Sequence, residues 1–144
     1  MSSSDDFNTQ IIEEFRANAG RVSGPFEGAT LLLLHHRGAR TGTARVYPVV
    51  YQRVGDAMAI FAAKGGAPHH PHWYLNLKAN PQTQVEVGTE KIDVVARELV
   101  GDERREVWER QKELTPGVAD CEEKTKGLRQ IPVMLLEPKK RPQL

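Results

Sequence analysis

The chain has 144 residues, a formal net charge of +1 at pH 7 and 39% hydrophobic residues. This length suits one domain with its own core, and the near-neutral charge argues against bulk electrostatic binding to nucleic acid. The single cysteine, Cys121, excludes an intrachain disulfide and a cysteine-rich metal site. No apolar run approaches the roughly 20 residues that span a bilayer, and the start lacks a signal-peptide core, so we expect a cytoplasmic protein.

The first predicted element is an amphipathic helix from about residue 5 to residue 19. Phe7, Ile11 and Phe15 recur at helical spacing, and Gly20 follows the end. We expect this helix to pack on the rest of the fold, with peripheral contact to the inner face of the membrane, or with a partner, as the less favoured alternative. The expected organisation is a helix at residues 1–20, a barrel domain at 21–138 and a basic tail at 139–144.

Strand patterns dominate the rest of the chain. The predicted strands cover residues 31–34, 43–53, 57–63, 83–87, 90–99 and 132–136. Helices are predicted at residues 71–79 and 102–114, the second capped by Asp102, with a short helical segment after Pro116-Gly117. Pro48 cannot donate to a strand ladder and should mark an edge or a bulge. Six strands with hairpin connections predict a mainly β (α+β) fold, a closed six-stranded antiparallel barrel with flanking helices.

A glycine-bracketed turn at residues 38–42 follows the first strand. Its two glycines leave the backbone bare, so a ligand can approach closely. Arg40 and Thr41 within the turn, and Arg45 just after it, supply donors suited to phosphate or carboxylate oxygens. The turn therefore predicts an anion-binding site, with surface salt bridges as the alternative for the two arginines.

A second glycine turn, Lys64-Gly65-Gly66, precedes a helix that Pro71 is placed to open. Free backbone N–H groups and a nearby helix N-terminus attract anions, and the lysine adds a cation. On that helix, Trp73 and Tyr74 would pack either against a planar ligand or against the core. Together the two turns predict an anion-binding site that faces a flat ring, with a ligand-free turn as the alternative at the glycine pair.

Five histidines suggest a metal site at first sight, but their placement argues against one. His35 and His36 are adjacent on a strand, so their side chains point to opposite faces. His69, His70 and His72 surround a proline and lack a carboxylate partner at a recognisable spacing. We therefore expect no metal site, and consider His72 only as an alternative proton donor.

The run from Leu31 to Pro138 resembles the deazaflavin-dependent nitroreductase family of actinobacterial split-barrel proteins, whose members bind the deazaflavin coenzyme F420. The matching stretches are Lys64-Gly65-Gly66-Ala67-Pro68, His70-Pro71, Trp73-Tyr74, Asn76-Leu77, Asn80-Pro81 ahead of residues 85–88, and the closing run at residues 129–138. The resemblance implies an FMN-binding-like split β-barrel and an F420-dependent oxidoreductase. Such an enzyme transfers a hydride to a small electrophile such as a quinone, an enone or a nitro compound.

The resemblance also implies site residues. Arg40, Thr41 and Arg45 would hold the phosphate and the start of the oligoglutamate tail. The other implied coenzyme contacts are Pro48, Val49, Val50, Ala62, Ala63, Lys64, Gly65, Gly66, Trp73, Tyr74 and Asn76. The implied substrate pocket contains Thr115, Val118 and Cys121, and no catalytic residue is assigned.

Departures from the family pattern concern the substrate more than the coenzyme. Many members carry a basic residue where this chain has Ala39, and a small hydroxyl residue where it has Ala63. Nitroreductase members have tyrosines at the positions of the implied substrate pocket. Because this chain has none there, we do not expect nitroimidazole reduction.

Three alternatives remain open at this point. The first is an FMN-dependent split-barrel oxidoreductase, and the second is a non-catalytic protein that binds or stores the deazaflavin. The third, a nucleic-acid-binding barrel, ranks last because Tyr47 and Tyr51 are the only aromatic residues near the basic cluster. A homodimer is a further open association, since the sequence shows no interface.

Overall fold

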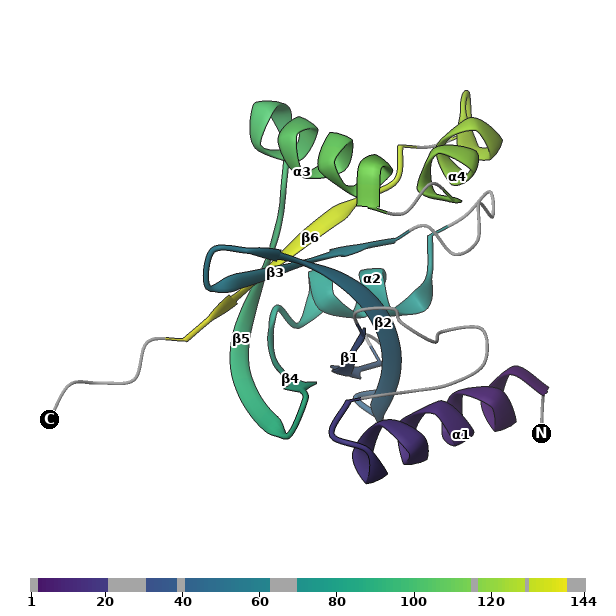
Figure 1. Ribbon diagram of the computed structural model, residues 1–144, viewed down its shortest axis with the longest axis vertical. Helices are drawn as coiled ribbons and strands as arrows, with labels where there is room; N and C mark the ends of the chain where they lie inside the picture. The colour runs from purple at the N-terminus through teal and green to yellow at the C-terminus, as the bar shows by residue number, and fades with distance from the viewer. Residues whose placement is uncertain are drawn as a thin grey trace, which may run out of the picture.

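The computed structural model describes residues 3–20, 31–38, 41–62, 70–114, 117–128 and 130–139. Six antiparallel strands close into a barrel in the order β1-β2-β3-β6-β5-β4 (Figure 1). The strands are β1 (Leu31–Arg37), β2 (Ala44–Val54), β3 (Ala57–Phe61), β4 (Gln82–Val87), β5 (Glu90–Glu98) and β6 (Val133–Pro138). The predicted fold class is confirmed.

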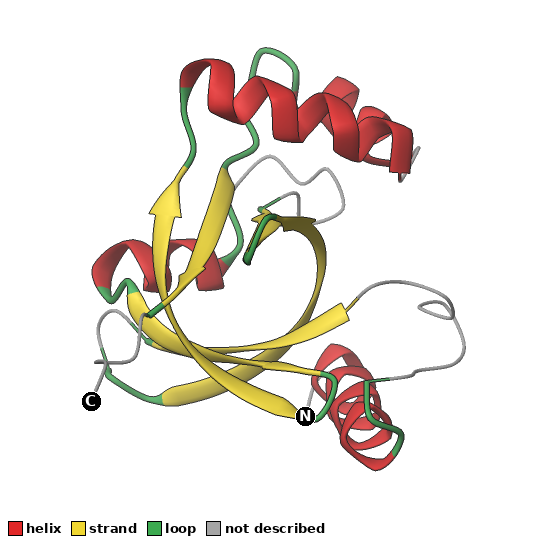
Figure 2. Cartoon of the chain, turned by 60° about the vertical axis from the view of Figure 1, so that its left-hand side comes forward, coloured by secondary structure: helices red, strands yellow, loops and turns green. Residues whose placement is uncertain are grey.

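Helices lie outside the barrel: α1 (Ser3–Ala17), α2 (His72–Ala79), α3 (Gly101–Leu114) and α4 (Gly117–Thr125). In both views α3 and α4 lie at one end of the molecule and α1 at the other (Figures 1 and 2). The helix predicted to follow an Asp102 cap already includes Gly101. Asp102 lies in its first turn, where its carboxylate pairs with Arg105 at 3.0 Å.

The alternation of side chains along β1 builds two hydrophobic layers. Leu32 and Leu34 point into the barrel, where they join the inner core. Leu31 and Leu33 point outward and pack with Ile11 and Phe15 of α1. All four leucines are buried because both faces of this strand are covered, and the sequence is accordingly a continuous apolar run.

Helix α1 is attached to the barrel by apolar, polar and backbone contacts. Phe15 is 1% exposed, and the Arg16 guanidinium donates to both oxygens of Glu86 on β4 at 3.1 and 2.7 Å. A Cβ atom on Gly20 would meet the Cα of Gly88 at 3.1 Å, so the end of the helix approaches the β4–β5 turn closely. The helix therefore packs on the barrel, as expected. Among the described residues, no helix has the length and apolar character needed to cross a membrane.

Local rules account for the connections. Val54 pairs with Ala57 across a turn that starts at Gly55, whose φ is 62°. The β4–β5 turn starts at Gly88 in the same way, with a φ of 58°. Both glycines occupy the left-handed region that other residues avoid. At Pro48 β2 pairs with β1 alone, because its pairing with β3 begins at Tyr51, so the expectation of an edge position is confirmed.

Candidate functional site

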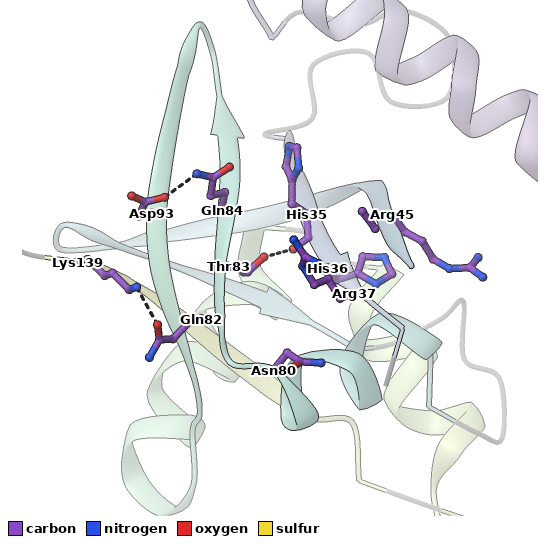
Figure 3. Close-up of a pocket in the computed structure, with 11 residues that line it drawn as sticks. His35, His36, Arg37, Arg45, Asn80, Gln82, Thr83, Gln84, Asp93 and Lys139 are labelled. Atoms are coloured by element: carbon purple, nitrogen blue, oxygen red, sulfur yellow. Dashed lines mark hydrogen bonds between the residues drawn. The ribbon is translucent and has the colours of Figure 1, made fainter. Parts of the chain in front are cut away.

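The barrel is least tightly closed where β1 meets β4. The two strands pair at Leu33 with Glu86 and at Leu34 with Val85. Further along, the Thr83 hydroxyl donates a hydrogen bond to the carbonyl of His35. A cavity of about 360 Å³ lies here, shown in Figure 3, and we call it the β1–β4 cavity. It is lined by His35, His36, Arg37, Ala44, Arg45, Asn80, Gln82, Thr83, Gln84, Asp93 and Lys139.

A second cavity, of about 490 Å³, lies between the end of the β1–β2 ladder and α2, and we call it the barrel-mouth cavity. Its described lining is His36, Gly38, Thr41, Arg45, Tyr47, His72, Leu75 and Asn76. His36 and Arg45 line both cavities, so the two lie next to each other. The volume falls within the range of small-molecule and cofactor sites.

The glycine turn after β1 presents the Thr41 hydroxyl to the barrel-mouth cavity, and the start of β2 presents the Arg45 cation. The Gly42 N–H donates to the Gly38 carbonyl at 2.8 Å, and Gly42 has a φ of 70°. The Thr41 Oγ1 accepts the N–H of Thr43 at 3.2 Å and keeps its own proton to donate to an anion. Arg45 is exposed, and within the described part of the chain it forms no salt bridge.

His36 and Asn76 are buried polar residues of this cavity. Asn76 on α2 lies 2.9 Å from the Nδ1 of His36, and Tyr47 stacks on the His36 ring at a centroid distance of 5.4 Å. Burial is the main cause that lowers the pKa of His36 to about 4, and the charge of Arg45 adds to the effect. The imidazole is therefore neutral at neutral pH.

The residues predicted to surround the coenzyme fall into two groups. Thr41, Arg45 and Asn76 come together at the barrel-mouth cavity. Ala62, Trp73 and Tyr74 instead belong to the inner core, and the Tyr74 hydroxyl donates to Glu98 at 2.6 Å. Burial raises the pKa of Tyr74, and this hydrogen bond adds to the rise. Trp73 and Tyr74 therefore pack in the core, which is the alternative to packing against a planar ligand.

The predicted contacts on β2 divide between the two faces of the strand. Val49 packs against the inner core. Val50 packs on the outside of the barrel, against the cluster that contains Ile11 and Phe15 of α1. Pro48 shares the outer face with Val50, because side chains alternate along a strand. Cys121 of the implied substrate pocket packs against another hydrophobic cluster, which contains Val107 and Trp108 of α3.

Several predicted site residues lie outside the described residues: Arg40, Ala63, Lys64, Gly65, Gly66 and Thr115. Val118 belongs to α4, but its side chain is not described. Their assigned roles stay predictions.

Besides Gly38 of the glycine turn and His72, the alternative proton donor, three residues that line the barrel-mouth cavity were not predicted at the coenzyme site: His36, Tyr47 and Leu75. For His36 and Tyr47, the alternation of side chains along the strands indicated which face of the sheet they occupy. His36 is paired with Arg45, and Leu34 with Tyr47, and cross-strand partners point to the same face. The exposure of Leu75, which is 48%, depends on how α2 meets the barrel and has no counterpart in the sequence pattern.

The two adjacent histidines of β1 lie on opposite faces of the strand. His35 Nε2 lies 2.7 Å from Glu86 on the outside, while His36 faces inward, and the two rings leave the strand in different directions (Figure 3). Across the part of the chain that the structure describes, no three histidine, cysteine or acidic side chains are grouped closely enough to hold a metal ion.

The sequence matches the family model of the F420H(2)-dependent quinone reductases over residues 8–138, and the chain belongs to this family. A relative is the F420H(2)-dependent quinone reductase of Mycobacterium tuberculosis, 44% identical over 84 residues. The matched region is 58% of this chain and 56% of that protein, so the match spans just over half the length of this relative. The description of this family names the reduced form of coenzyme F420, the coenzyme that the sequence predicts, and a reductase activity. It does not confirm the nitroreductase label.

Two of the solved structures that share the fold are also similar to this chain in sequence. One is an F420-H2 dependent reductase, 38% identical, with a TM-score of 0.68 over 75% of this chain and 94% of its own. The other is described as a domain-swapped dimer and is 35% identical, with a TM-score of 0.70 over 94% of this chain and 100% of its own. The likeness confirms the split-barrel prediction.

Proposed function

We propose that this chain is a reductase that uses reduced coenzyme F420 and has quinones as its acceptors. The family description and the name of the mycobacterial relative support the choice of quinones over enones and nitro compounds. When bound, the reduced deazaflavin supplies a hydride, so the chain itself needs groups that bind and orient. The observation that carries the proposal is the barrel-mouth cavity, in which a cation and a hydroxyl flank a buried neutral imidazole.

Each part of this cavity suits one part of the coenzyme. Arg45 and Thr41 supply charge-assisted and neutral hydrogen bonds to a phosphate at the cavity entrance. Tyr47 and His36, whose rings stack on each other, line the cavity, and Leu75 adds an apolar edge. The residues present therefore fit a planar ligand that carries an anionic chain.

The domain-swapped neighbour supports one further element of the proposal, a homodimer. Peripheral membrane contact finds no comparable support, because Ile11 and Phe15 of α1 pack on the barrel. A second copy of this chain is thus the macromolecular partner that we propose.

The first test is a fluorescence titration of the purified protein with coenzyme F420, with FMN and FAD measured in parallel. We expect the deazaflavin to bind in preference to both flavins, and the reduced coenzyme then to be oxidised by a quinone. A preference for FMN would place the chain among flavin-dependent barrels. Tight deazaflavin binding without turnover of any acceptor would favour a storage protein.

Substitution of Arg45 tests the phosphate assignment. We expect Arg45→Ala to weaken deazaflavin binding by about 1–3 kcal/mol, and the loss to shrink as salt rises. The control is Arg53→Ala on the same strand, since Arg53 is exposed and lies over the Tyr51 ring at 5.8 Å, outside the cavity lining. An equal effect of both substitutions would remove Arg45 from the site.

A further inference from the structure

One residue that lines the barrel-mouth cavity, His36, has a polar atom whose hydrogen-bonding capacity the described chain does not use. His36 is 3% exposed, and its Nε2 atom is buried without a hydrogen-bond partner. Buried polar atoms in native proteins are nearly always satisfied, because an unpaired one pays for desolvation without compensation. The residue that carries this exception, His36, lines the cavity where we propose that the coenzyme binds.

The neighbours of His36 determine which nitrogen carries the proton. The Asn76 side-chain amide donates to Nδ1 at 2.9 Å, so Nδ1 accepts and has no hydrogen of its own. Burial lowers the pKa of His36 to about 4, which keeps a second proton off the ring. In the neutral imidazole the single proton must then reside on Nε2, and the unpartnered atom is a donor.

The same neighbours hold this donor in place. Tyr47 stacks on the imidazole face from β2, and Asn76 is fixed to α2, where its backbone carbonyl accepts the N–H of Asn80 at 2.9 Å. His36 is the cross-strand partner of Arg45, so the two side chains leave the sheet on the same face. A neutral donor of fixed direction therefore lies beside the cation assigned to the phosphate.

We propose that His36 is a positioning residue for the coenzyme, its Nε2–H donating a hydrogen bond to an oxygen of the ribityl-phosphate chain held beside Arg45. The inference rests on the proposed function and adds a contact to it. In the desolvated wall of the cavity this hydrogen bond is strong, and it orients the chain between the ring and the phosphate.

Two substitutions of His36 separate the donor from the shape of the side chain. His36→Leu removes the Nε2–H, whereas His36→Gln can place an amide N–H near the same position. By fluorescence titration we expect the dissociation constant for coenzyme F420 to rise about tenfold in His36→Leu and to recover most of the way in His36→Gln. The control is His35→Gln, on the opposite face of β1, which should bind as the wild type does.

The outcomes of this titration are distinct from those of the proposed function. If the wild type does not bind the deazaflavin, the proposed function fails. If the wild type binds and His36→Leu binds equally well, the assignment of His36 is wrong while the function stands. Thermal unfolding of each variant shows that it is folded before it is titrated.

Nitrogen-15 NMR of the histidine-labelled wild-type protein provides a second test that needs no variant. Without ligand at pH 7, we expect the His36 shifts of a neutral ring protonated at Nε2. On addition of coenzyme F420, the Nε2–H proton should move downfield as it gains an acceptor. A ring protonated at Nδ1, or an Nε2–H signal unmoved by saturating coenzyme, would overturn the proposal.

Discussion

Arg45 and His36 face the same cavity from neighbouring strands and supply different kinds of hydrogen-bond donor. The guanidinium is exposed and permanently charged, whereas the imidazole is buried and neutral. The charge of Arg45 is one of the causes that lower the pKa of His36, after burial. The pair thus combines long-range attraction for an anion with a short-range donor that needs no counter-ion.

The lowered pKa of His36 predicts a pH dependence of stability. Between the ordinary value of 6.5 and about 4, the unfolded chain takes up a proton that the folded chain does not. The neutral His36 imidazole therefore makes its full contribution to the free energy of unfolding above pH 6.5. This contribution, roughly 3 kcal/mol, is lost as the pH falls to 4.

Urea unfolding of the wild type and His36→Gln at pH 7 and pH 4.5 measures this contribution of His36 to the free energy of unfolding. The variant lacks the imidazole but keeps every other titrating group. We therefore expect the wild-type advantage in unfolding free energy to shrink at the lower pH. A difference that stays constant between the two pH values would mean that His36 is not held neutral by the fold.

At the scale of elements, one carboxylate adds a polar link to the apolar contacts that hold α1 on the barrel. Glu86 on β4 accepts two hydrogen bonds from Arg16 and lies 2.7 Å from His35 Nε2. The hydrogen bonds from Arg16 are the main cause that lowers the pKa of Glu86 to about 2. The carboxylate is thus ionised throughout the neutral range and connects α1, β1 and β4.

We expect Glu86→Gln to destabilise the protein at pH 7 by about 1–2 kcal/mol, because a bidentate pair is lost but Arg16 is half exposed and screened. The contribution is present above pH 4.5 and is lost as the pH falls toward 2. Urea unfolding at pH 7 and 2.5 measures it, and hydrogen exchange should show faster exchange in α1. Glu90→Gln, an exposed carboxylate on the same hairpin, is the control. Equal effects at both positions would exclude a specific role for Glu86.

At the scale of the whole molecule, β6 closes the barrel. It pairs with β3 on one side and β5 on the other, although both partners lie far earlier in the chain. Leu136 of this strand is fully buried in the inner core, where it packs with residues such as Ile60 and Val94. Barrel closure therefore depends on packing between distant segments.

We expect Leu136→Ala to lower the free energy of unfolding by about 2–5 kcal/mol, since it removes buried methyl groups and leaves a cavity. Leu128→Ala is the matched control, because that leucine is 64% exposed and its loss should change stability by less than about 0.5 kcal/mol. Denaturant titration measures both. A comparable small change in both variants would mean that the core around β6 can rearrange to fill the space.

The elements themselves could largely be predicted from the sequence. The run of four leucines, the turns at Gly55 and Gly88, and the apolar spacing of the first helix are local signals that constrain the backbone before any packing occurs. The Gly38–Gly42 turn placed Thr41 and Arg45 at a cavity for the same reason. Only the boundaries moved, as at Asp102, because helix ends depend on competing side-chain contacts.

Local pattern in this sequence determined the strands, their alternation and the residue types suited to an anion and a flat ring. Tertiary structure alone decided which of these residues meet. It buried Trp73 and Tyr74 in the core, turned Val50 toward α1, and brought Asn76 from α2 against His36 of β1. The physical reason is that burial and hydrogen-bond partnership arise between segments that are distant in the chain. The tautomer of one imidazole therefore depends on a helix 40 residues away.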